Sequence, residues 1–185
     1  MAEIVLLVLV VKNAMGGGSV QILIGLETMR FDGIGLVLSA LVLVLGVCVT
    51  LFSFPYMDKE KGEEKFYALL MMTIGSIIGL GFAYDLFNLW IWFEAMAIST
   101  YFLVAFYNEQ SASLEAGIKY LVQSSVGSAL VLFGIAAIFA AQGSVSLEDI
   151  WQYGDQLGAL GVIGLALMII GFGVKAALVP MHTWL

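Results

Sequence analysis

Four ionisable residues lie in or beside long apolar segments of the sequence: Glu94, Lys119, Lys175 and His182. A charged residue at the centre of a membrane span costs about 3 kcal/mol or more, so it is usually retained for a function. Glu94 follows Leu86 by eight residues, which is roughly 12 Å along a helix and too deep for its short side chain to reach the interface. We therefore expect Glu94 to carry protons or ions, with a structural ion pair between helices as the alternative.

The neighbours of Glu94 on a helix would form an aromatic wall with small residues beside it. Positions three, four and seven residues away share its face. They are occupied by Trp90, Ile91, Ala97, Ile98 and Tyr101. The surroundings predicted for the carboxylate are therefore largely apolar.

Lys119 has a structural and a functional interpretation. It follows Glu115 by four residues, so an ion pair along one helix, or a side chain that reaches the interface, would explain it. A strip of polar and small residues continues along the same helix through Gln123, Ser124, Gly127 and Ser128. Such a strip can pack tightly on a neighbouring helix or hold water, and the second case favours a hydrated path that leads inward from the lysine.

Lys175 lies among glycines and is followed by Pro180. A break in a membrane helix is tolerated only where protein or a water-filled cavity surrounds the freed backbone groups. A Glu–Lys pair that opens and closes at such a place would change its proton affinity over a wide range. His182 comes after the break and titrates near neutral pH when unperturbed. Its alternative role is that of a helix-end anchor beside Trp184.

The composition indicates an integral membrane protein, because 62% of the residues are hydrophobic and 11% are charged, against roughly 25% charged in soluble domains. Several of the 14 acids lie in the short segments 58–65 and 147–149, and their charge is explained if these segments are solvated loops. The seven Lys and Arg residues form no basic patch, which argues against nucleic-acid binding. Cys48 is the single cysteine, so the chain has no internal disulfide and no cysteine-based metal site. We expect no metal, cofactor or redox centre.

Uncharged segments of about 20 residues predict an all-α, polytopic membrane fold. The predicted spans are 33–57, 66–84, 86–108, 116–141 and 157–185, the last of them broken near Pro180. Residues 1–11 are expected to form a partial helix and 12–32 a loop with room for a short strand pair. The segment 141–156 is expected to hold a short helix at the interface. The lysines of the 58–65 loop favour a cytoplasmic position for it.

Three segments together resemble the antiporter-like membrane subunits of respiratory complex I, membrane-bound hydrogenases and F420H2 dehydrogenases, and the Mrp-type sodium/proton antiporters. They are "DLFNLWIWFEAMAISTYFLVAF" (85–106), "AGIKYLVQSSVGSALVLFGIA" (116–136) and "GFGVKAALVPMHTWL" (171–185). The resemblance covers residues 31–185. It implies that Glu94 and Lys175 form the pair that drives proton translocation, with Lys119 in the path, and that other membrane subunits are the partners.

Members of that family are longer and contain two inverted repeats. By the resemblance, the five predicted spans correspond to the third to seventh of the family, and "HTWL" stands where the family continues with Pro-Asp-Ala. We therefore expect a partial chain, either a truncated product or a split subunit. The expected role is that of a proton-translocating subunit of an NADH:quinone oxidoreductase-type complex, multi-pass in a prokaryotic inner membrane. The alternatives are a structural scaffold without transport and an Mrp-type Na+/H+ antiporter subunit.

Overall fold

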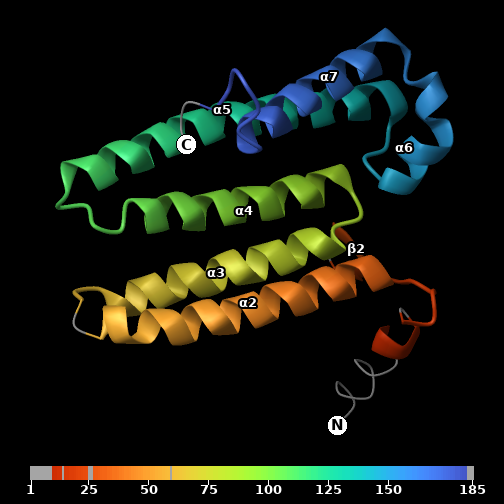
Figure 1. The fold of residues 1–185 in the computed structure, drawn as a ribbon. Helices are drawn as coiled ribbons and strands as arrows, with labels where there is room; N and C mark the ends of the chain where they lie inside the picture. The colour runs from red at the N-terminus through yellow and green to blue at the C-terminus, as the bar shows by residue number, and fades with distance from the viewer. Residues whose placement is uncertain (1–9, 14, 25–26, 59, 183–185) are drawn as a thin grey trace.

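The computed structural model of the chain describes residues 10–13, 15–24, 27–58 and 60–182. Among these residues, five helices are long and apolar enough to cross a membrane. They are α2 (Gly33–Met57), α3 (Glu63–Phe82), α4 (Leu86–Val104), α5 (Ser111–Gln142) and α7 (Gly158–Lys175) (Figure 1). The predicted all-α, polytopic fold is confirmed.

Two helices begin at aspartates that cap them. The Asp32 carboxylate accepts a hydrogen bond of 2.9 Å from the Gly35 backbone N–H at the start of α2. The Asp85 carboxylate accepts one of 2.7 Å from the Asn88 N–H at the start of α4. Each side chain satisfies an N–H group that the helix itself leaves without a partner, so both helices begin where the sequence predicts.

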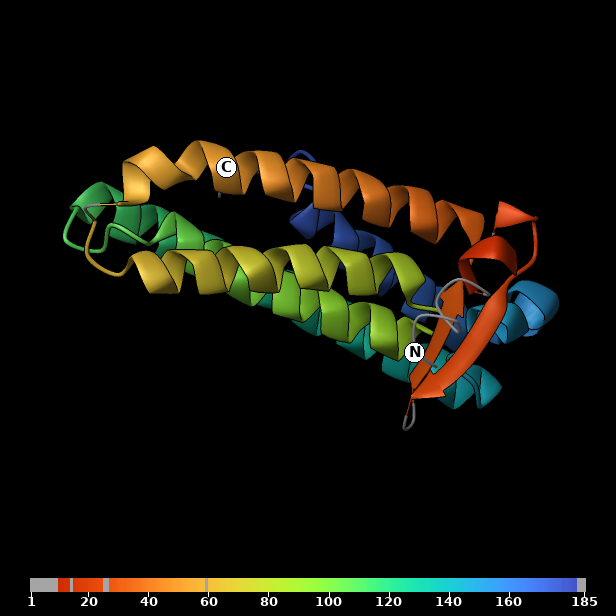
Figure 2. The same cartoon turned by 90° about the horizontal axis from the view of Figure 1, so that it is seen from below.

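Short elements gather at one end of the bundle. Strands β1 (Val20–Ile24) and β2 (Glu27–Phe31) pair antiparallel within the segment predicted as a loop with a strand pair. Helix α6 (Leu147–Tyr153) and the 3-10 turn η1 (Gly154–Gln156) lie at the same end (Figure 2). Residues 10–13 are helical, whereas 1–9 of the predicted partial helix lie outside the described residues.

Helix α7 ends at Lys175, well before the end of the predicted span 157–185. The Leu178 N–H donates to Gly173 O at 2.9 Å and the Ala177 N–H donates to Val174 O at 3.2 Å. This pattern is a Schellman motif, and Ala177 has the left-handed conformation, φ 52°, that the motif requires. The helix therefore stops by its own hydrogen bonding ahead of Pro180, and 183–185 lie outside the described residues.

The backbones of α5 and α7 are in direct contact at several glycines. A Cβ added to Gly134 would lie 2.6 Å from Gly164 O, and one added to Gly171 would lie 2.6 Å from Gly127 O. Small residues of this kind let membrane helices come into van der Waals contact along their backbones. The glycine contacts therefore bind α5 and α7 into one unit.

We expect Gly134→Ala to weaken this unit by about 1–3 kcal/mol, because the added methyl group meets a backbone carbonyl that has no room to yield. The measurement is the thermal unfolding temperature of the purified protein in detergent. The matched control is Gly75→Ala, since Gly75 has open space around its Cβ position. A Gly134→Ala protein as stable as the Gly75→Ala protein would contradict the packing described here.

Helices α2, α3 and α4 form the second unit of the bundle (Figure 1). A Cβ on Gly79 of α3 would overlap the Trp92 ring of α4, and Thr73 of α3 donates to Ser99 Oγ of α4 at 2.8 Å. The outer helix α2 exposes large apolar side chains, among them Leu51 and Phe52. A continuous apolar surface of this kind suits contact with lipid.

Candidate functional site

Glu94 of α4 and Lys175 of α7 meet where the two units join. Lys175 Nζ lies 3.7 Å from Glu94 Oε2, which is within ion-pair range. The Lys175 side chain is 8% exposed and the Glu94 side chain 27% exposed. Lys175 is also the last residue of α7, where the negative end of the helix dipole favours a cation. The C-terminus of α7 and the Glu94 carboxylate thus both offset the cost of burying charged Lys175.

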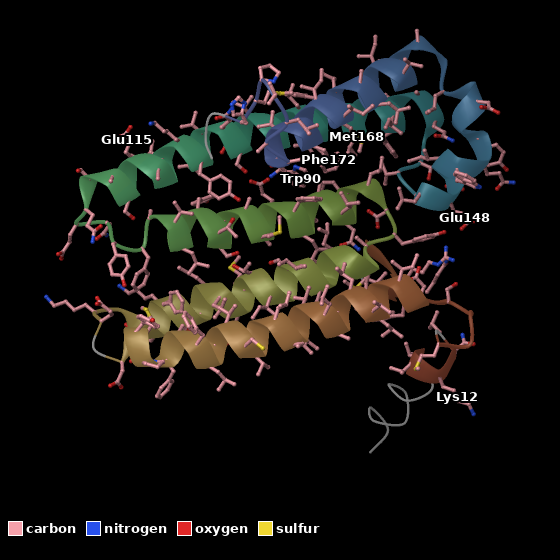
Figure 3. All side chains as sticks on the ribbon, viewed as in Figure 1. Lys12, Trp90, Glu115, Glu148, Met168 and Phe172 are labelled. Atoms are coloured by element: carbon pink, nitrogen blue, oxygen red, sulfur yellow. The ribbon has the colours of Figure 1, made fainter. Side chains whose placement is uncertain are left out.

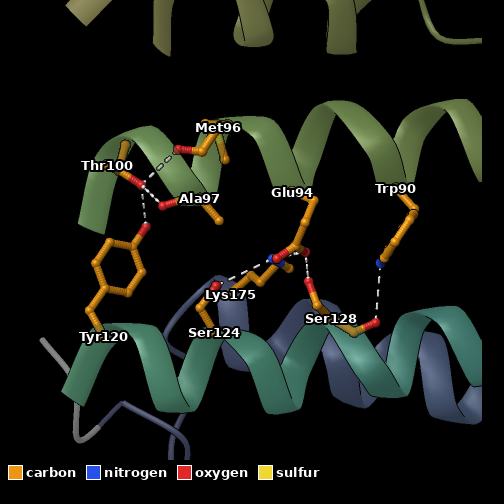
Figure 4. A network of polar contacts seen from close by, with 9 residues as sticks. All are labelled: Trp90, Glu94, Met96, Ala97, Thr100, Tyr120, Ser124, Ser128 and Lys175. Atoms are coloured by element: carbon orange, nitrogen blue, oxygen red, sulfur yellow. Dashed lines mark hydrogen bonds and ion pairs between the residues drawn. The ribbon is translucent and has the colours of Figure 1, made fainter. Parts of the chain in front are cut away.

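Two serines of α5 complete the surroundings of this pair (Figure 4). Ser128 Oγ donates a short hydrogen bond to Glu94 Oε2, and Lys175 Nζ lies 3.4 Å from Ser124 Oγ. Trp90, one turn before Glu94 on α4, donates from Nε1 to Ser128 O at 3.2 Å. Helix α5 therefore holds both members of the pair through side chains of the predicted polar strip.

Beside the predicted Trp90, a further aromatic residue that the helical spacing did not single out lies next to the pair. Lys175 Nζ lies 5.8 Å from the ring centre of Phe93, and Phe93 packs against Phe172 of α7 at 5.3 Å. An ammonium group within about 6 Å of an aromatic face is attracted to it. Phe93 and Phe172 thus keep the pair in an apolar environment while still favouring the cation.

A partly open cavity of about 440 Å³ lies beside Lys175, between α4, α5 and α7. Most of its wall is apolar, and its polar lining side chains are Tyr120, Ser124 and Lys175. A buried water needs at least two polar partners and about 30 Å³ of space, and both are present here. The cavity can therefore hold water in contact with the lysine.

The structure does not bring Lys119 or His182 to the pair. Lys119 Nζ forms an ion pair of 2.6 Å with Glu115 of the same helix, and both side chains are more than half exposed. An ion pair along one helix is the structural interpretation of Lys119 that its four-residue spacing from Glu115 indicated. His182 is exposed in the segment after α7. That segment is fixed to α5 by the Gln123 side chain, which donates to Met181 O at 3.1 Å.

A second polar cluster lies at the end of the bundle that carries the hairpin, far from the pair. Arg30 of β2 donates to Tyr84 Oη at 2.5 Å, and Tyr84 donates to the Glu148 carboxylate of α6. The hydrogen bond to Glu148, together with burial, raises the pKa of Tyr84 above its usual value. Figure 3 shows Glu148 at this end and Glu115 at the opposite end of α5. The cluster fastens the hairpin and α6 to the α3–α4 connection.

The described residues contain no group of three or more His, Cys, Asp or Glu side chains that could hold a metal ion. Cys48 is exposed on α2, away from the charged pair. The described site places a carboxylate and an amine beside a cavity.

Five helices long and apolar enough to span a membrane, with a charged pair between α4 and α7, define an integral, multi-pass membrane protein. Residues 83–185 match the family described as NADH:quinone oxidoreductase/Mrp antiporter, transmembrane. Residues 18–67 match the family described as NADH-ubiquinone oxidoreductase (complex I), chain 5 N-terminus. The chain belongs to this family of antiporter-like membrane subunits, as the three resembling segments predicted.

Two curated relatives cover most of the chain. The F(420)H(2) dehydrogenase subunit N of Methanosarcina mazei is 33% identical over 172 residues, which are 92% of this chain and 35% of the relative. The NADH-quinone oxidoreductase subunit N of Desulforamulus reducens is 31% identical over 147 residues, which are 78% of this chain and 31% of the relative. The chain thus spans about a third of the length of the curated relatives it matches.

Solved structures with the same fold belong to membrane complexes. The membrane-bound sulfane sulfur reductase, an archaeal respiratory membrane complex, contains a chain with a TM-score of 0.82 and 27% identity, over 95% of this chain and 37% of that one. Respiratory complex I from Thermus thermophilus with bound aureothin gives a TM-score of 0.71 and 26% identity, over 97% of this chain and 38% of that one.

Proposed function

We propose that the chain is part of a proton-translocating subunit in a complex I-type energy-converting membrane complex. The observation that carries this proposal is the ion pair of 3.7 Å between Glu94 and Lys175 at the junction of two helix units. Both groups exchange protons, and the cavity beside Lys175 has room for the water that would deliver them. A change in the separation of the pair would change the proton affinity of both groups.

Lys119 and His182 are proposed as outer members of the path. Lys119 stands about 7 Å along α5 from Ser124, on the side of the 105–110 connection, so it can attract or release protons at the surface. His182 lies in the segment that continues from α7. The partners are other membrane subunits, by analogy with the relatives, and a prokaryotic inner membrane is the proposed location.

The assay for this function is redox-driven acidification of sealed inside-out vesicles that contain the full-length chain in its complex. We expect acidification that a protonophore abolishes and that stays unchanged when K+ replaces Na+ in the buffer. Na+-dependent acidification would instead favour the Mrp-type alternative. Redox turnover without ion movement, in vesicles shown to be tight, would contradict transport and leave the scaffold role.

A further inference from the structure

Helix α6 carries the most exposed of the large apolar and aromatic side chains that the structure describes. Trp151 is 90% exposed, and Tyr153 on the same helix is 44% exposed. An indole ring combines a large apolar surface with a polar N–H group, and membrane proteins place it preferentially at the bilayer interface. Trp151 is therefore available to a partner outside this chain.

The contacts of α6 fix the side of the helix from which Trp151 projects. Leu147 and Ile150 pack against the buried core cluster that joins α5 and α7. The Gln142 side chain, at the end of α5, donates to Asp149 O at 3.0 Å. The exposure of Trp151 thus belongs to a helix that is docked on the core, and the side chain leaves that helix on its outer side.

Helix α6 begins level with the start of α4. The Leu86 N–H donates to Val145 O at 2.9 Å, and the Leu147 N–H donates to Tyr84 O at 3.3 Å. Since α4 has 19 residues, its length of about 28 Å matches the hydrocarbon core of a bilayer. Figures 1 and 2 show α6 at and beyond this end of α4. In a membrane, α6 therefore lies in the layer of lipid headgroups.

The charged side chains that share α6 and the following turn with Trp151 are acidic. Glu148 precedes Trp151 by three residues and Asp155 follows it by four, and both are exposed. Residues at these spacings are neighbours on a helical surface. The segment 120–174 contains no Lys, Arg or His, and Arg30 of the second polar cluster already donates a hydrogen bond there. The outer face of α6 thus presents negative charge beside an aromatic ring, without a cation from its own segment.

An aromatic ring and carboxylates together bind ammonium groups. A cation within about 6 Å of an indole ring is attracted to its face, and a primary ammonium group donates hydrogen bonds that carboxylates accept. The quaternary ammonium of choline donates none. The indole N–H of Trp151 can only donate, so it suits a phosphate oxygen. An ethanolamine phospholipid carries both the primary ammonium and the phosphate on one headgroup.

We propose that the outer face of α6, made of Glu148, Trp151 and Asp155, binds the headgroup of an ethanolamine phospholipid. The ammonium group lies against the indole ring and pairs with the carboxylates, and the phosphate accepts a hydrogen bond from the indole N–H. The bound headgroup anchors α6 at the membrane interface. This site is separate from the Glu94–Lys175 pair and does not depend on proton transport.

The test is photo-cross-linking of lipid to the segment 143–157, in membranes that contain the full-length chain in its complex. Two probes carry the same photoreactive acyl chain, with the reactive group close to the glycerol, and differ only in an ethanolamine or a choline headgroup. Mass spectrometry quantifies the lipid-modified peptide. We expect the ethanolamine probe to give the higher yield. Trp151→Leu should lower that yield about two- to fivefold, the factor that a cation–π contact at an exposed site gives.

Three further variants make the result specific. Trp151→Tyr keeps an aromatic ring and a hydrogen-bond donor, and should retain most of the yield. Asp155→Asn keeps the ring but removes one carboxylate, so it should narrow the difference between the two probes. The matched control is Phe133→Leu, because Phe133 is 67% exposed on α5 and has no acid within four residues. It should leave both yields unchanged.

Three outcomes would overturn the lipid site. Equal yields from the two probes in the unmodified chain would mean that α6 does not distinguish between ammonium groups. An undiminished ethanolamine yield in Trp151→Leu would mean that the ring takes no part. Reaction of neither probe would mean that protein covers this face, and carbodiimide coupling of Asp155 to a lysine of another subunit would identify that protein. Cross-linking requires no turnover, so a failure of proton transport would leave these results unchanged.

Discussion

Replacement of Glu94 by glutamine is expected to lower redox-driven proton transport by about a hundredfold or more, the range that a proton-transferring side chain contributes. Glutamine has nearly the same shape, and its amide oxygen can accept the hydrogen bond that Ser128 donates to Glu94. It cannot bind a proton or pair with Lys175. The measurement is the initial rate of vesicle acidification per assembled complex, with redox turnover recorded in parallel.

The matched controls are Glu109→Gln and Glu115→Gln, which neutralise exposed acids near the ends of α4 and α5. Glu115 pairs with Lys119 on the surface, where solvent screens the two charges and an exposed pair contributes little to stability. Both controls should retain most of the transport. If Glu94→Gln reduced only the yield of complex, and each assembled complex pumped at the normal rate, Glu94 would be a structural ion bridge.

Replacement of Lys175 by methionine is expected to remove transport and also to destabilise the protein. The methionine side chain is one atom shorter than that of lysine and suits the apolar wall of Phe93 and Phe172, but it leaves the Glu94 carboxylate without its cation. Removing one partner of a fully buried ion pair costs about 3–5 kcal/mol, and the loss here should be smaller because the Glu94 side chain is 27% exposed. The loss is measured as a fall in unfolding temperature of the purified complex, together with the acidification assay. Lys175→Arg, which keeps the charge, is the control for stability.

The double variant Glu94→Gln, Lys175→Met separates stability from transport. With both charges removed, no unpaired ion remains, so most of the lost stability should return, and the two substitutions should be strongly non-additive. Transport should stay at the level of Glu94→Gln. Recovery of transport along with stability would show that the pair serves only to hold α4 against α7.

The spanning helices could be predicted from the sequence because their signal is local. Uncharged runs of sufficient length mark the spans, and the aspartates at 32 and 85 mark two of the helix starts. The end of α7 carries no such signal. It depends on a Schellman motif whose left-handed position holds Ala177, where glycine would be the recognisable residue. Only the approach of Pro180 indicated that the helix must stop.

The charged residues of the site could be predicted, since a carboxylate or an ammonium group in an apolar segment is conspicuous. Their supporting contacts could not, because these join residues that are distant in the chain. Ser128 and Ser124 belonged to a strip that predicted either water or packing, and the structure directs both serines at the pair. Phe93 was overlooked, since its position next to Glu94 places it on another face of an ideal helix.

The contacts within the α5–α7 unit are of a different kind from the contacts that join this unit to α4. Within the α5–α7 unit the backbones touch at Gly127, Gly134, Gly164 and Gly171, so Lys175 is carried by a nearly rigid body. Around the charged pair, the boundary between α4 and α5 is bridged by hydrogen bonds that Trp90 donates, that Glu94 accepts and in which Thr100 takes part. Side chains rearrange at lower cost than packed backbones. A displacement of the α2–α4 unit relative to the α5–α7 unit would therefore change the separation of Glu94 and Lys175 with less strain than a rearrangement within either unit.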